Sequence, residues 1–128
     1  NGVSDGMAEF VCPLCATIHL SGSTITLTSC AMAVMVMMNQ SIGFGKMFPF
    51  ILMLGVTMVA APGVPGGAVM AALGILQSML GFDDTMCGLM IALYIAQDSF
   101  GTACNVTGDG AIAVLMDAIT GKKKAAAK

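Results

Sequence analysis

Arginine and tryptophan are absent from this sequence, and charge of either sign is scarce. The 128 residues include five basic residues, all of them lysine, against seven acidic ones, and the formal net charge is -2. Only 9% of the residues are charged, whereas about 25% is usual for a soluble domain. A chain with no arginine and no basic patch lacks the electrostatic footprint of a nucleic-acid-binding protein. Nucleic acid is therefore excluded as a partner.

Apolar residues make up 57% of the chain, and the mean hydropathy is +0.91. A soluble chain of this size cannot bury so much apolar surface, because small domains bury the smallest fraction of theirs. The composition predicts an all-α membrane protein surrounded by lipid, and it argues against a soluble enzyme. The sequence begins at Asn1 and shows no signal peptide, so we expect a fragment that lacks its N-terminal part.

The charges leave two long uncharged windows, 10–45 and 47–82. In the first, a polar stretch at 17–24 interrupts apolar residues, which predicts a broken transmembrane helix over about 11–38 with an unwound centre. The alternative is a continuous helix whose hydroxyl groups bond to its own backbone.

The second window is divided by the segment APGVPGG, residues 61–67, which cannot continue a helix. Each flanking apolar segment is too short to cross about 30 Å of hydrocarbon. We predict a re-entrant helical hairpin over about 47–82, with a single kinked and tilted helix as the alternative.

A long final transmembrane helix is predicted over about 84–120, followed by a basic tail at 122–128. By the positive-inside rule, this tail places the C-terminus in the cytoplasm of a multi-pass protein in the inner or plasma membrane. The hairpin then enters the membrane from the outside. Lys46 lies on this outer side and is a single exception to the positive-inside rule.

One face of the final helix carries a polar stripe of Asp98, Thr102, Asn105 and Asp109, at helical spacings of four, three and four. Carboxylates at membrane depth typically mark ion or substrate pathways, which favours cation binding; hydrogen bonding between helices is the alternative. Oxygen ligands of this kind suit sodium. His19 is a candidate proton site or a hydrogen-bonded polar residue.

Three segments carry a family resemblance. Residues 13–23, PLCATIHLSGS, resemble the PLGATINMDGT segment of the dicarboxylate/amino acid:cation symporter family, which has the glutamate-transporter fold. GVPGG at 63–67 resembles the tip of the second re-entrant hairpin of this family, and DSFGTACNVTGD at 98–109 resembles its DxxRTxxNVxGD segment. The resemblance implies a homotrimeric, elevator-type transporter without catalytic residues or an organic cofactor, of which this chain forms the C-terminal part of the transport domain, residues 1–121.

The resemblance also assigns roles to single residues. Asp98 would bind the substrate amino group, and the remaining residues of the substrate pocket would be Ser23, Val64, Gly67, Gly101, Thr102 and Asn105. One sodium site would use the Cys15 carbonyl with His19, Asn105 and Asp109. A second would use backbone oxygens at Thr17, Met58, Val59 and Ala61.

Departures from the family pattern narrow the range of substrates that we expect. Gly101 stands where the family has the arginine that pairs with acidic substrates, so we expect a small neutral amino acid such as serine, threonine or alanine. Ser21 replaces the aspartate of a third cation site, which leaves the number of sodium ions open. The short hairpin tip resembles the serine/threonine:sodium symporter branch. The alternatives are a dicarboxylate or acidic amino acid symporter, a channel-like or structural membrane subunit, and a membrane enzyme that uses Asp98 and Asp109.

Overall fold

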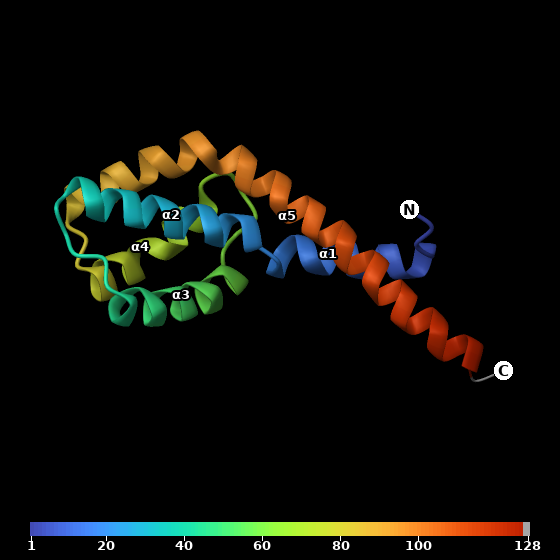
Figure 1. Ribbon diagram of the computed structural model, residues 1–128. Helices are drawn as coiled ribbons and strands as arrows, with labels where there is room; N and C mark the ends of the chain where they lie inside the picture. The colour runs from blue at the N-terminus through green and yellow to red at the C-terminus, as the bar shows by residue number, and fades with distance from the viewer. Residues whose placement is uncertain (127–128) are drawn as a thin grey trace.

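The computed structural model describes the backbone of residues 1–126 and the side chains of residues 1–121. Within these residues the secondary structure is entirely helical. The helices are α1 (Asp5–Ile18), α2 (Ser21–Met37), α3 (Phe44–Val59), α4 (Gly67–Leu80) and α5 (Asp84–Ala126). Helix α5 runs the whole length of the molecule, with α1 beside its C-terminal half and the other three helices beside its N-terminal half (Figure 1).

Helices α1 and α2 are two parts of an interrupted helix. Only His19 and Leu20, with φ/ψ of -105°/96° and -120°/46°, leave helical geometry between them. The predicted unwound centre over 17–24 is therefore too long. Beyond the break, threonine hydroxyls donate to the backbone carbonyls four residues earlier, as from Thr24 to Leu20 at 2.8 Å. The hydroxyl bonds of the alternative prediction are therefore present in α2, but the helix is not continuous.

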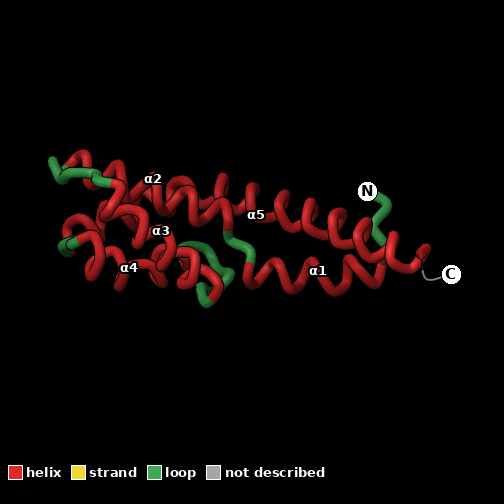
Figure 2. Tube along the Cα trace, turned by 60° about the horizontal axis from the view of Figure 1, so that its bottom comes forward, coloured by secondary structure: helices red, strands yellow, loops and turns green. Residues whose placement is uncertain are grey.

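Helices α3 and α4 form a hairpin whose tip lies in the middle of the molecule. At about 1.5 Å per residue, 16 and 14 residues extend about 24 Å and 21 Å, less than the thickness of a bilayer. The tip lies beside the break between α1 and α2, and the views of Figure 1 and Figure 2 agree on this placement. At the open end, the Lys46 ammonium donates to the Leu80 carbonyl at 2.8 Å.

Helix α5 has 43 residues and reaches about 65 Å. It continues to Ala126, past the predicted end at 120, so most of the predicted basic tail at 122–128 is helical in its backbone; Lys128 lies outside the described residues. The main core lies between α2, the hairpin and the first half of α5, around residues such as Leu27, Phe50 and Tyr94.

Helices α2 and α5 cross in backbone contact at Gly22 and Gly101. A Cβ atom at Gly22 would overlap the Gly101 carbonyl, and one at Gly101 would lie 3.2 Å from Thr26 Oγ1. Small residues at a helix crossing allow such close approach. The contact brings short polar side chains on α5 within reach of the α2 backbone.

Much of the outer surface is apolar, with exposed side chains such as Phe10, Ile25, Phe44 and Val56. Among the described residues, one helical segment is long and apolar enough to cross a membrane: Asp5–Met37, which joins α1 and α2. The hairpin helices are apolar but shorter.

Candidate functional site

A cavity of about 230 Å³ lies where the helix break, the hairpin tip and α5 meet. Three chain segments far apart in the sequence therefore build one site. Its polar lining comes from α5, α2 and the break between α1 and α2. The lining residues are Ala16, His19, Leu20, Ser23, Pro62, Gly63, Val64, Pro65, Ala68, Tyr94, Asp98, Thr102, Asn105, Val106 and Asp109.

Asn105 fixes the start of α2 against α5. Its side-chain oxygen accepts the Gly22 N–H at 2.8 Å, and its amide nitrogen donates to Ser23 Oγ at 3.0 Å. The Gly22 N–H belongs to the first turn of α2, where backbone donors have no partner within the helix. Asn105 thus satisfies a free helix donor and orients the Ser23 hydroxyl, and both side chains are buried.

Asp98 connects α5 to the hairpin tip. Its Oδ2 accepts the backbone N–H of Gly66 at 3.1 Å. Gly66 precedes α4 and has φ of 75°, a left-handed conformation that glycine adopts without strain. Thr102 lies one turn further along α5 and lines the same cavity.

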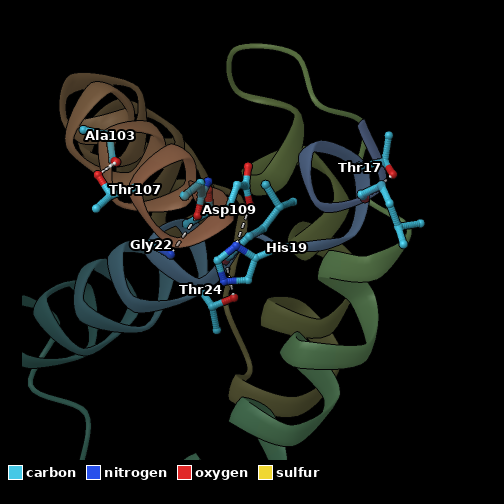
Figure 3. Close-up of polar contacts among 11 residues, drawn as sticks. Thr17, His19, Gly22, Thr24, Ala103, Thr107 and Asp109 are labelled. Carbon is cyan, nitrogen blue, oxygen red and sulfur yellow. Dashed lines mark hydrogen bonds and ion pairs between the residues drawn. The ribbon is translucent and has the colours of Figure 1, made fainter. Parts of the chain in front are cut away.

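His19 and Asp109 form an ion pair or hydrogen bond of 2.7 Å between Nδ1 and Oδ1 across the helix break, and Figure 3 shows the two side chains facing each other. Both are mostly shielded, with 24% and 13% of the side chain exposed. A Cβ atom at Gly108 would overlap the His19 ring. Glycine at position 108 therefore leaves room for the imidazole next to Asp109.

The structure brings most of the predicted substrate residues together. Ser23, Val64, Asp98, Thr102 and Asn105 all line the cavity. Gly67 and Gly101 do not.

Gly67 lies at the start of α4, where a Cβ atom would overlap the Pro62 carbonyl, so it shapes the tip. Gly101 packs on the α2 backbone at Gly22 and Ser23. On this side of α5, the neighbour of Gly101 is therefore α2, and Gly101 lies next to the lining residue Ser23.

The residues of the first predicted sodium site also lie close together. The Cys15 carbonyl accepts the His19 N–H at 2.8 Å, and His19 contacts Asp109. Asp109 and Asn105 both line the cavity. Among the described residues, no three His, Cys, Asp or Glu side chains cluster as a metal centre, so a cation here would depend on carbonyl and amide oxygens beside the single Asp109 carboxylate.

The second predicted sodium site lies between two helix C-termini. Thr17 is in the last turn of α1, and Met58 and Val59 are in the last turn of α3. The two helices contact each other, and Figure 3 shows Thr17 next to the end of α3. Free carbonyls and the negative ends of two helix dipoles favour a cation at such a place. Ala61 follows α3, and its N–H donates to the Met58 carbonyl at 3.3 Å.

Among the lining residues with polar side chains, sequence reasoning missed Tyr94. It is buried, with 1% of its surface exposed, and its side chain borders the cavity. It precedes Asp98 by four residues, so it continues the polar stripe by one helical turn. That spacing was the signal from which it could have been found.

The chain belongs to the sodium:dicarboxylate symporter family, whose model matches residues 1–119. The helix break, the re-entrant hairpin and the polar stripe of α5 all lie within the matched residues. The resemblance seen in the sequence is confirmed. No solved structure matches the chain.

Among curated proteins, human neutral amino acid transporter A is 28% identical over 109 residues, covering 85% of this chain and 20% of its own length. Human neutral amino acid transporter B(0) is 27% identical over the same length. Mouse excitatory amino acid transporter 5 is 28% identical over 116 residues, or 91% of this chain and 21% of its own length. The chain thus spans about a fifth of the length of these relatives.

The family and these relatives are transporters, not enzymes. Sodium-coupled symport of small substrates is thus supported at the level of the family, and a membrane location follows from it.

Proposed function

We propose that the protein containing this chain carries a small neutral amino acid across a membrane together with sodium. In this proposal the cavity between the helix break, the hairpin tip and α5 is the substrate site. Asp98 pairs with the substrate ammonium, while Ser23, Thr102 and Asn105 offer polar groups to the rest of the amino acid. The hairpin tip at Val64 borders the cavity and closes it from the other side.

The observation that carries the proposal is that the Asp98 carboxylate lines the cavity and has no basic side chain as a partner there. Among the residues that the structure describes, the lining contains neither lysine nor arginine. The one imidazole, His19, is already engaged with Asp109. A partly buried carboxylate without a counter-charge favours a bound cation, and the ammonium of an amino acid supplies one.

The same lining argues against an acidic substrate. Aspartate or glutamate would bring a second carboxylate next to Asp98, and burying an unpaired charge is costly. The place of the family arginine is taken by Gly101, which faces α2. The relatives named neutral amino acid transporters agree with a neutral substrate; the one named an excitatory amino acid transporter represents the alternative.

Sodium is the proposed coupling ion, and it binds as a transported species. The first site uses Asp109, Asn105, His19 and the Cys15 carbonyl. Asp109 Oδ1 contacts His19, so Oδ2 is the oxygen proposed to face the ion. The second site uses the carbonyls at the ends of α1 and α3.

The proposal extends to the architecture of the whole protein. The break between α1 and α2 and the tip of the α3–α4 hairpin belong to a transport domain that moves as an elevator within a homotrimer. The lysines at 122–124 place the C-terminus in the cytoplasm by the positive-inside rule, and the hairpin enters from the opposite side. The exposed apolar side chains of α2 and α3 then face lipid or the rest of the protein.

The test is uptake of radiolabelled serine by the full-length protein reconstituted in liposomes. Serine should accumulate only when a sodium gradient is directed inward, and the uptake should saturate. A matched potassium gradient is the control for leakage. Serine flux that neither saturates nor requires sodium would favour a channel-like or structural subunit instead.

A further inference from the structure

Two hydrogen bonds hold His19 at the break between α1 and α2. Its backbone N–H donates to the Cys15 carbonyl at 2.8 Å, and its ring Nδ1 contacts Asp109 Oδ1 at 2.7 Å. A carboxylate can only accept, so Nδ1 carries the hydrogen of the second bond. The imidazole therefore acts on Asp109 as a donor, and Figure 3 shows the two side chains facing each other.

The imidazole lies against Gly108, the residue that precedes Asp109 on α5. A Cβ atom at position 108 would overlap the ring Cε1 atom and would lie 3.3 Å from each ring nitrogen. These atoms are the far end of a side chain, so a methyl group at 108 would displace the imidazole and leave the backbone of α5 in place. Glycine in the middle of a helix is otherwise less favourable than alanine. The glycine at 108 therefore has a specific use, which is to make room for the ring.

Asn105 and Asp109 hold the two sides of the helix break from one face of α5. Asn105 accepts the Gly22 N–H at 2.8 Å at the start of α2, and Asp109 accepts the bond from His19. The two side chains are neighbours on the helix surface, because they are four residues apart. The carboxylate is thus fixed relative to the Asn105 amide and the Cys15 carbonyl, which belong to the first proposed sodium site.

We propose that the His19 imidazole is a positioning residue of the first sodium site and that Gly108 provides the space for it: the ring holds Asp109 through Oδ1, so that Oδ2 is presented to the ion. This inference rests on the proposed function, in which sodium binds beside Asp109. Carboxylate and carbonyl oxygens are the ligands that hard cations prefer, whereas imidazole nitrogen suits transition metals. The ring therefore acts on sodium through Asp109 and not as a ligand.

A carboxylate that is held at one oxygen has its orientation before the ion arrives. Without the imidazole bond, the Asp109 side chain would rotate between conformers, and sodium binding would have to order it. A site that is already ordered binds more tightly, because this cost is removed. We therefore expect the contact between His19 and Gly108 to set the sodium affinity, and serine binding at saturating sodium to be independent of it.

Three variants of the full-length protein form a double-mutant cycle that tests this contact. Gly108→Ala should raise the sodium concentration for half-maximal binding about tenfold, a usual effect of losing the hydrogen-bond partner of a metal ligand. His19→Ala should have the same effect, because it removes the same bond. The double variant should bind sodium no more weakly than His19→Ala, since the methyl group at 108 then has no ring to displace.

The matched control is Gly110→Ala, two residues further along α5, where an added Cβ atom meets no atom of the described residues within 4 Å. It makes the same change in helix propensity and should bind sodium like the wild type. The measurement is the rise in unfolding temperature of the purified protein when sodium chloride replaces choline chloride in the absence of substrate. The unfolding temperature in choline alone separates lost folding from lost binding. Serine binding at saturating sodium is then measured on the same samples.

Wild-type sodium affinity in Gly108→Ala would overturn the positioning role and leave the proposed function intact. Losses that add in the double variant, or weaker serine binding at saturating sodium, would also overturn it, because the substitutions would then act separately or on the whole cavity. A wild-type protein that sodium does not stabilise, and that takes up serine without sodium, would overturn the proposed function together with this inference.

Discussion

The Asp98 carboxylate accepts the Gly66 backbone N–H at 3.1 Å, which ties the middle of α5 to the tip of the α3–α4 hairpin. The residue proposed to hold the substrate ammonium is therefore bonded to the segment proposed to close the site. An ammonium ion at Asp98 adds a strong donor to the same carboxylate. Substrate binding and the position of the tip are expected to be coupled through this one side chain.

The first prediction concerns Asp98→Asn. The variant keeps an oxygen that can accept the Gly66 N–H but loses the charge that pairs with an ammonium. Amino-acid binding should weaken by about a hundredfold, since breaking a buried charge pair is worth about 3 kcal/mol or more. Isothermal titration of the purified full-length protein with serine measures the change. The control is Asp84→Asn, at the exposed start of α5, and retained affinity in Asp98→Asn would refute the role of Asp98.

The second prediction concerns Asp109→Asn. Removing the only carboxylate of the first proposed sodium site should raise the sodium concentration for half-maximal uptake at least about tenfold, which corresponds to about 1.4 kcal/mol. Sodium activation curves at saturating serine give this number. Asp117→Asn is the matched control on the same helix, where the carboxylate accepts a hydrogen bond from Ser4 at 2.5 Å. An unchanged curve in Asp109→Asn would mean that Asp109 is not a sodium ligand.

The third prediction concerns the crossing of α2 and α5. Gly22→Ala would place a Cβ atom against the Gly101 carbonyl, and such overpacking typically costs about 1–3 kcal/mol. The unfolding temperature of the detergent-solubilised protein should fall. Gly88→Ala is the control, because a Cβ atom there meets no other atom within 4 Å and helix propensity alone favours alanine. Equal unfolding temperatures in both variants would contradict backbone contact at Gly22.

The fourth prediction concerns Gly101→Arg. Gly101→Arg would be expected to favour acidic substrates if position 101 faced the pocket. In the structure Gly101 lies against Ser23 and Thr26 of α2, so the arginine should separate the helices and reduce the amount of folded protein. Size-exclusion chromatography after expression measures this loss. Folded protein with newly gained aspartate uptake would show that the side chain reaches the cavity.

The positions of the helices could be predicted largely from the sequence, because each boundary has a local cause. Two prolines and three glycines in 61–67 end α3 and delay α4. The polar spacing of Asp98, Thr102 and Asn105 fixes one face of α5. These features depend on neighbouring residues alone.

The features that could not be predicted from the sequence depend on contacts between distant segments. The break is limited to His19 and Leu20, because α2 begins at Ser21 and the Asn105 side chain accepts the free N–H of Gly22 in its first turn. Helical spacing places Gly101 next to Asp98 but cannot show that α2 covers it. Only the tertiary structure places Tyr94 at the cavity.

The substrate class is the central claim, and competition against labelled serine in liposomes containing the full-length protein tests it most directly. Serine, threonine and alanine should each suppress sodium-driven uptake at concentrations at which aspartate and glutamate have little effect. The reason is that the cavity lining, among the described residues, offers Asp98 and no lysine or arginine. Strong inhibition by aspartate or glutamate, with none by unlabelled threonine or alanine, would contradict the account.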